Sequence, residues 1–202
     1  SECELGSTRA EVIKKVEAYW KARDAKPLTS NGHVFNDNSA VYGVAAFLYS
    51  GDEAYASLYN SIMWAVAGDD PQYLQMAGDW LIGRDQNGEY GSLAFSFPAI
   101  ACADSQDKGL AAARAEWPKD AAKAPIFGYW MGPGLQCTYW TAKPTPALKI
   151  TAKGAPPILV LGATGDPATP FQQAQWMAEQ LDSGVLITWE GAGHSAYELG
   201  ND

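Results

Sequence analysis

The sequence has little of what metal sites, nucleic-acid surfaces and membrane spans are built from. Its 202 residues include two histidines and three cysteines with no C-x-x-C pair, which argues against a zinc site. The 14 lysines and arginines form no run, and a formal charge of −9 argues against phosphate binding. No apolar run approaches the roughly 20 residues of a membrane span. We therefore expect no metal, no nucleic acid and no membrane span.

The N-terminus also lacks features of a complete precursor. Ser-Glu-Cys-Glu at residues 1–4 offers neither an initiator methionine nor the basic and apolar regions of a signal peptide. We therefore expect a chain that was processed, or cut from something longer. An odd number of cysteines, namely Cys3, Cys102 and Cys137, fits one internal disulfide and one cysteine whose partner lies elsewhere. Eight tryptophans and ten tyrosines in an acidic chain are compatible with secretion.

The first 123 residues have the periodicity of short amphipathic helices. Thr8 and Glu11 form a capping box that opens a helix ending before Pro27. Asn38 or Ser39 is expected to cap a second helix that ends at Gly51. A third helix is predicted over residues 55–68, a fourth over 71–82 and a short one over 108–116, whereas residues 84–103 and 127–139 are predicted to be loops and His33 a turn residue.

The last quarter of the sequence predicts a strand, a helix and a second strand. The apolar run at residues 158–161 is typical of a parallel strand that is covered on both faces. Thr-Pro-Phe-Gln at residues 169–172 is a second capping box, with proline at the first helical position. Residues 185–189 form the next strand, which a right-handed crossover would bring beside the first. Two strands are too few for a stable sheet, so the unit should belong to a larger one.

Two residues with catalytic chemistry follow these strands. Asp166 lies just after the first strand, and His194 comes 28 residues later, after the second. An α/β-hydrolase presents the acid and the base of its triad in this order: the histidine accepts the proton of a nucleophile, and the carboxylate fixes the histidine tautomer. The alternative is that Asp166 is an ordinary turn residue and His194 a polar loop residue.

Longer motifs carry a family resemblance. Pro-Ile-Leu-Val-Leu-Gly-Ala-Thr-Gly-Asp-Pro-Ala-Thr-Pro and Glu-Gly-Ala-Gly-His-Ser-Ala-Tyr, within residues 156–197, resemble the C-terminal region of secreted bacterial tripeptidyl aminopeptidases of the α/β-hydrolase superfamily. Residues 99–104 and 136–140 resemble segments at the exit of that family's helical cap. The resemblance implies an α/β fold, with a mostly helical cap or lid subdomain over residues 1–125 and an irregular connection over 126–155. Residues 156–202 would then be the C-terminal strand-helix-strand unit of the parallel sheet.

The same resemblance implies roles for individual residues. Asp166 and His194 would be the catalytic Asp and His, and Cys102 and Cys137 would form a disulfide. The sequence departs from the family in having no G-x-S-x-G motif for the nucleophile. Ser92 lacks the second glycine and a preceding strand, and Ser195 sits beside the histidine, so both are interpreted as loop serines. The nucleophile is therefore expected on a missing N-terminal segment or a second polypeptide, and this chain alone is expected to be inactive.

These observations predict a fragment of a secreted serine exopeptidase that cleaves peptides near a free N-terminus without a cofactor. An aminopeptidase needs an acidic group to hold the substrate ammonium, and Asp104 could supply it, or could cap the helical segment that begins near Ser105. Two alternatives remain open: a carboxylesterase that uses the same triad, and a non-catalytic module that binds peptides or a partner.

Overall fold

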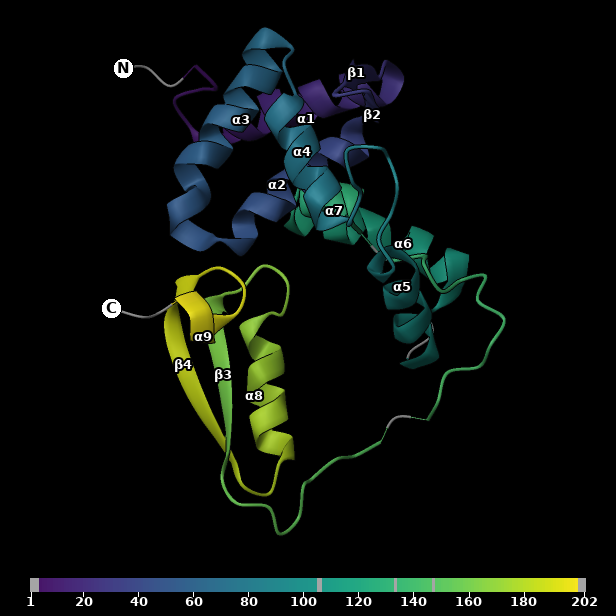
Figure 1. The fold of residues 1–202 in the computed structure, drawn as a ribbon, viewed down its shortest axis with the longest axis vertical. Coiled ribbons are helices and arrows are strands. Elements are labelled where there is room, and N and C mark those ends of the chain that lie inside the picture. The colour runs from purple at the N-terminus through teal and green to yellow at the C-terminus, as the bar shows by residue number, and fades with distance from the viewer. Residues whose placement is uncertain (1–3, 105–106, 133, 147, 200–202) are drawn as a thin grey trace. The chain divides into compact units, whose positions relative to one another are not determined.

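The computed structural model describes residues 4–104, 107–132, 134–146 and 148–199. The chain divides into two compact units (Figure 1). The first, here called the helical unit, comprises Ser1–Val44 and Tyr59–Pro146; the second, the sheet unit, comprises Ala45–Leu58 and Ala147–Asp202. Residues 45–58 thus pack with the C-terminal strands although they lie in the helical part of the sequence. The domain boundaries at residues 125 and 155 stay a prediction.

The helical unit begins with α1 (Arg9–Ala25), which has the predicted capping box. The Thr8 hydroxyl accepts a hydrogen bond from the Glu11 N–H, and the Glu11 carboxylate accepts one from the Thr8 N–H. The helix ends before Pro27, as predicted, and it buries one face whose main members are Val16, Tyr19 and Trp20. Local sequence therefore sets both ends of this helix.

A β-hairpin that the sequence analysis missed follows α1. Strands β1 (Leu28–Ser30) and β2 (His33–Phe35) pair antiparallel, and Asn31 and Gly32 between them have positive φ of 51° and 78°. Two residues of positive φ give the turn whose twist matches that of the flanking strands. The prediction of His33 as a turn residue was wrong: it is a buried strand residue, because the turn ends at Gly32.

Three further helices complete the first half of the chain: α2 (Asp37–Tyr49), α3 (Tyr55–Gly68) and α4 (Gln72–Leu81), with a short 3₁₀ helix η1 (Gly51–Ala54) between α2 and α3. The Asn36 side chain accepts a hydrogen bond from the Ser39 N–H, so Asn36 caps α2 rather than Asn38 or Ser39. A Cβ on Gly43 would lie 2.3 Å from the Leu74 carbonyl oxygen. Glycine thus allows the backbones of α2 and α4 to meet.

Two predicted loops contain helices. Helix α5 (Leu93–Asp104) takes up the second half of residues 84–103, and α7 (Phe127–Trp130) lies within 127–139. The first loop prediction was wrong from residue 93 onward, because the glycines of this segment all precede residue 92, whereas a leucine and four alanines, which favour a helix, follow. Helix α7 is a single turn, too short to show a period. Helix α6 (Gly109–Lys123) runs past the predicted end and contains Pro118.

The sheet unit consists of the predicted strand, helix and strand. Strand β3 (Ile158–Gly165) pairs parallel with β4 (Gly184–Ala192), and α8 (Phe171–Gln180) connects them (Figure 1). Helix α8 covers one face, where a Cβ on Gly162 would lie 2.7 Å from the Cβ of Ala174. The chain ends with the short helix α9 (Ala196–Leu199). The α/β fold, with its C-terminal parallel unit, is therefore as predicted.

The opposite face of this sheet is not covered by the described residues. Paired positions of the two strands present apolar side chains there that are 40–59% exposed, namely Leu159, Leu161, Val185 and Ile187. The expectation that both faces are covered is thus wrong for this chain by itself, because α8 packs against both strands while these four side chains of the opposite face stay exposed. We call these four side chains the open sheet face.

Candidate active site

Asp166 follows the last residue of β3 and folds back into a tight turn. Its Oδ1 accepts hydrogen bonds from the N–H groups of Ala168 and Thr169, both at 2.8 Å. Its Oδ2 accepts a third from the Thr169 hydroxyl at 2.9 Å. An aspartate at the start of such a turn satisfies backbone donors that the strand no longer pairs. The carboxylate is held in one orientation, and its side chain is only 6% exposed.

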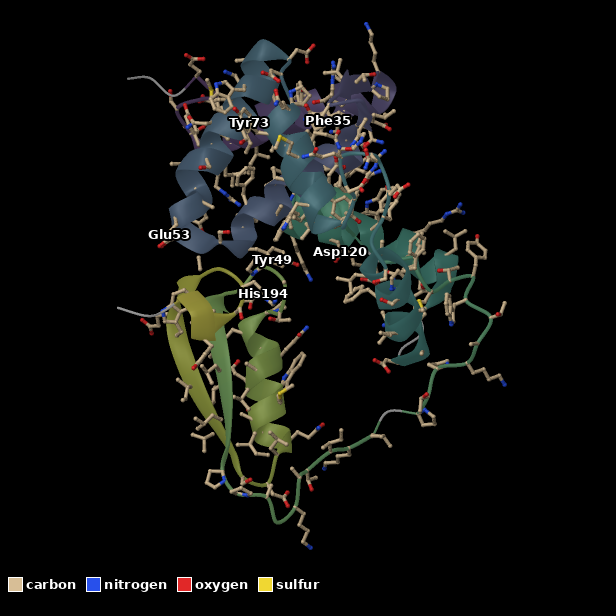
Figure 2. All side chains as sticks on the ribbon, viewed as in Figure 1. Phe35, Tyr49, Glu53, Tyr73, Asp120 and His194 are labelled. Atoms are coloured by element: carbon tan, nitrogen blue, oxygen red, sulfur yellow. A yellow bond between two sulfur atoms is a disulfide. The ribbon has the colours of Figure 1, made fainter. Side chains whose placement is uncertain are left out.

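His194 lies in the loop after β4 and is fixed first by its backbone. Its N–H donates to the Tyr49 carbonyl oxygen at 2.8 Å, and the preceding Gly193 N–H donates to the Gly165 carbonyl oxygen at 3.3 Å. Gly193 is buried and has a φ of 120°, a conformation that requires glycine. Figure 2 shows Tyr49 and His194 side by side. The loop therefore joins the carboxyl ends of both strands to the end of α2.

The structure brings the two predicted triad residues together. The Nδ1 of His194 lies 3.1 Å from each carboxylate oxygen of Asp166. Such contact places the proton on Nδ1 and leaves Nε2 with a lone pair that can accept a proton. The histidine side chain is 36% exposed. Among the described hydrogen bonds, none joins His194 to a serine hydroxyl.

The pKa of Asp166 is lowered from its ordinary value. Burial acts in the opposite direction and raises it, but hydrogen bonds from the Thr169 N–H, the Ala168 N–H, the Thr169 hydroxyl and His194 stabilise the charged form and together prevail. The carboxylate thus stays ionised at neutral pH. An ionised partner at Nδ1 is what an imidazole needs in order to stabilise the positive charge it gains with a second proton.

Thr169 is a member of the site that the sequence analysis assigned elsewhere. It was predicted to cap α8, but Pro170 occupies the cap position without a side-chain hydrogen bond, and the Thr169 hydroxyl bonds Asp166 instead. The same hydroxyl lies 3.4 Å from the Nδ1 of His194. The Asp-x-x-Thr spacing at residues 166–169 could have revealed this role. An aspartate that begins a turn often accepts hydrogen bonds from the residue three positions later. The contact of Tyr49 with His194, by contrast, has no local signal in the sequence.

The other candidates of the sequence analysis lie in the helical unit or outside the described residues. Asp104 is the exposed last residue of α5, and the cap predicted near Ser105 lies outside the described residues, as does Cys3. Cys102 and Cys137 are joined by a disulfide. Asp107, which was not predicted, supports this region by accepting hydrogen bonds from the Cys137 N–H and the Thr138 hydroxyl.

The hydrogen bonds described for the His194 ring go to Asp166 and Thr169 and to neither Ser92 nor Ser195. Ser92 precedes α5, where its carbonyl oxygen accepts from Ser96 N–H, and Ser195 has a φ of 77° beside His194. In the described ranges, no cluster of three or more histidine, cysteine or acidic side chains could hold a metal ion. No helix within those ranges is long and apolar enough to cross a membrane.

Known proteins resemble this chain over nearly its whole length. A carboxylesterase B of Mycobacterium tuberculosis is 29% identical over 98% of this chain and 39% of its own length. The serine protease Hip1 of the same species is 27% identical over 98% of this chain and 40% of its own length. A tripeptidyl aminopeptidase of Streptomyces lividans is 27% identical over 94% of this chain and 35% of its own length. The chain therefore spans about two fifths of the curated relatives it matches.

A family model described as TAP-like protein matches residues 124–202. The matched segment contains β3, α8, β4 and both residues of the Asp166–His194 pair. It also accounts for the resemblance of the motifs around these residues to tripeptidyl aminopeptidases. Residues 124–202 are therefore similar to the TAP-like family, and the residues of the Asp166–His194 pair lie within the similar segment.

Proposed function

We propose that this chain supplies the acid and the base of a Ser-His-Asp triad in a secreted serine exopeptidase whose nucleophile lies outside the chain. The observation that carries the proposal is the Nδ1 of His194 at 3.1 Å from both oxygens of an ionised Asp166, at the carboxyl ends of two paired parallel strands. Open α/β sheets place their working groups at this edge. The relatives named above as a carboxylesterase, a serine protease and an aminopeptidase are all hydrolases by name.

The residues fit a two-step acyl transfer. The Nε2 of His194 accepts the proton of the serine hydroxyl as the serine oxygen attacks the scissile carbonyl, and Asp166 stabilises the imidazolium that forms. The imidazolium then gives its proton to the leaving amine. In the second step Nε2 takes a proton from water as the water oxygen attacks the acyl-enzyme, and the imidazolium returns the proton to the serine oxygen as the acid is released. The chemistry uses no cofactor.

A peptide substrate is favoured over an ester because two of the named relatives are peptidases. In an aminopeptidase, an acidic group would hold the substrate ammonium, and Asp104 is our candidate because it is exposed at the end of α5. A carboxylesterase is the second candidate, since one relative carries that name and the same triad cleaves esters.

The nucleophile is proposed to come from a further segment or a second polypeptide. The open sheet face supports this, because four apolar side chains paired across two strands need a covering layer. The relatives supply a source for it, since this chain corresponds to about two fifths of their length. Secretion is proposed from the disulfide between Cys102 and Cys137, because disulfides persist in oxidising compartments.

A fluorophosphonate probe, which labels activated serines, tests the proposal directly. The chain should be left unlabelled by itself and should allow labelling when joined to a segment that carries the G-x-S-x-G motif. His194→Gln and Asp166→Asn should then lower turnover of a tripeptidyl amide by about 10³-fold or more. Comparing that amide with a p-nitrophenyl ester separates peptidase from carboxylesterase. A joined protein that binds peptides but takes up no probe would instead indicate a non-catalytic binding module.

A further inference from the structure

The geometry points to Tyr49 and Gly51 as positioning residues that hold His194 in the orientation needed for proton transfer. Both belong to the sheet unit, in the short segment where α2 ends and η1 begins. This inference rests on the proposed function, because it concerns how the proposed base is held. The contact of Tyr49 and Gly51 with the loop of His194 can be tested whether or not the chain takes part in catalysis.

The backbone contact is the first part of the argument. The Tyr49 carbonyl oxygen accepts the hydrogen bond of the His194 N–H at 2.8 Å. Two residues later, Gly51 is buried with a φ of 65°, and a Cβ there would overlap the Ala192 carbonyl oxygen. Any other residue would therefore push the end of β4 away. The absence of a side chain at Gly51 lets the segment lie directly against the loop that carries His194.

The ring contact is the second part. The rings of Tyr49 and His194 are 5.1 Å apart between centroids, at an interplanar angle of 64°, an edge-on aromatic arrangement. Asp166 holds the imidazole only at Nδ1, and the terminal torsion of a histidine has a broad energy minimum. A second contact on the ring limits that rotation. Together, Asp166 and Tyr49 fix the direction in which Nε2 points.

This role is one of positioning, since Tyr49 touches the proposed base through the ring and the main chain. Orientation has kinetic weight in acyl transfer because the nucleophile, the base and the carbonyl must align within a fraction of an ångström. If the ring supplies the orientation, phenylalanine should replace tyrosine without loss, whereas an aliphatic residue of similar size should not.

The first test uses the 202-residue chain and the nuclear magnetic resonance signals of its histidine rings. Only His33 and His194 contribute, so His33 serves as an internal reference. Tyr49→Leu should remove the ring-current shift that Tyr49 imposes on the His194 ring protons, and Tyr49→Phe should retain it. Tyr42→Leu is the matched control, because Tyr42 lies earlier on α2 and is 37% exposed. Unchanged His194 signals in Tyr49→Leu would overturn the inference.

Two glycine variants test the backbone contact independently. Gly51 and Gly83 have almost the same positive φ, 65° and 69°, so alanine strains both backbones alike. A Cβ on Gly83 meets nothing within 4 Å, whereas one on Gly51 meets Ala192. Gly51→Ala should therefore displace the His194 signals, and Gly83→Ala should leave them in place. Equal behaviour of the two variants would contradict the contact.

Kinetics of the joined, active protein complete the test. Tyr49→Leu should lower kcat about tenfold with little change in KM, a loss of the size of one aromatic contact, and Tyr49→Phe should restore it. An unchanged kcat in Tyr49→Leu would overturn the positioning role. If the joined protein has no hydrolase activity at all, the proposed function fails, whereas the His194 spectra still decide whether Tyr49 holds the ring.

Discussion

At the scale of single residues, the site depends on one carboxylate that is bound from several sides. Asp166 accepts two backbone N–H groups and the Thr169 hydroxyl before it meets His194. The turn after β3 therefore orients the Asp166 carboxylate, and His194 contacts a carboxylate that is already held in place. The hydroxyl is the most easily removed member of this set, because it belongs to a side chain that is otherwise exposed.

Thr169→Val should raise the pKa of Asp166, because the variant loses a hydrogen bond to the charged form and keeps the side-chain shape. Thr169→Ser should retain the low pKa. The ¹³C shift of the Asp166 carboxyl, followed through an acid titration, measures the effect. Identical titrations of the valine and serine variants would show that the backbone N–H groups alone set the pKa.

Acid should weaken the sheet unit through the same carboxylate. The pKa of Asp166 is lowered in the folded chain, so its stabilising contribution is complete above the unfolded value of about 3.9 and is lost as the pH falls through the folded pKa. Urea unfolding at pH 6 and at pH 3 should therefore show a smaller pH dependence in Asp166→Asn than in the original chain. An equal dependence in both would assign the acid sensitivity to other groups.

At the scale of elements, helix α2 meets α4 through glycine. Gly43→Ala should lower the free energy of unfolding by about 1–3 kcal/mol, because the new methyl would overlap the Leu74 carbonyl oxygen. Gly68→Ala, at the end of α3 with nothing within 4 Å, should be neutral or slightly stabilising. Urea denaturation of the two variants measures the difference. A neutral Gly43→Ala would mean that α2 and α4 can move apart at little cost.

The helices and strands also show which parts of the fold the sequence could predict and why other parts were not predicted. Helix α1 and the unit of β3, α8 and β4 were predictable because caps and apolar periods are local. The β1–β2 hairpin escaped because three-residue strands are too short to show alternation, and α5 because Pro98 and neighbouring glycines obscured its pattern. The order of strand ends placed Asp166 near His194, but contacts between distant residues have no local signal, so Tyr49 was not predictable.

At the scale of the whole molecule, one disulfide links the two ends of a long stretch of the helical unit. Cys102 and Cys137 are 35 residues apart and enclose α6 and α7. Replacing both with alanine should lower the free energy of unfolding by about 2–4 kcal/mol, mainly because the unfolded chain gains freedom. Tryptophan fluorescence during urea unfolding measures the loss. A change below about 1 kcal/mol would indicate that packing alone holds this stretch.

Both histidines of the chain face a carboxylate through Nδ1, but only one can be reached by solvent. The His33 side chain is 8% exposed and contacts Asp79 at 2.7 Å, whereas that of His194 is 36% exposed. An acylating reagent such as diethyl pyrocarbonate should therefore modify His194 well before His33. The fold thus gives the chain a single chemically addressable imidazole, whose reactivity can be followed without introducing any label.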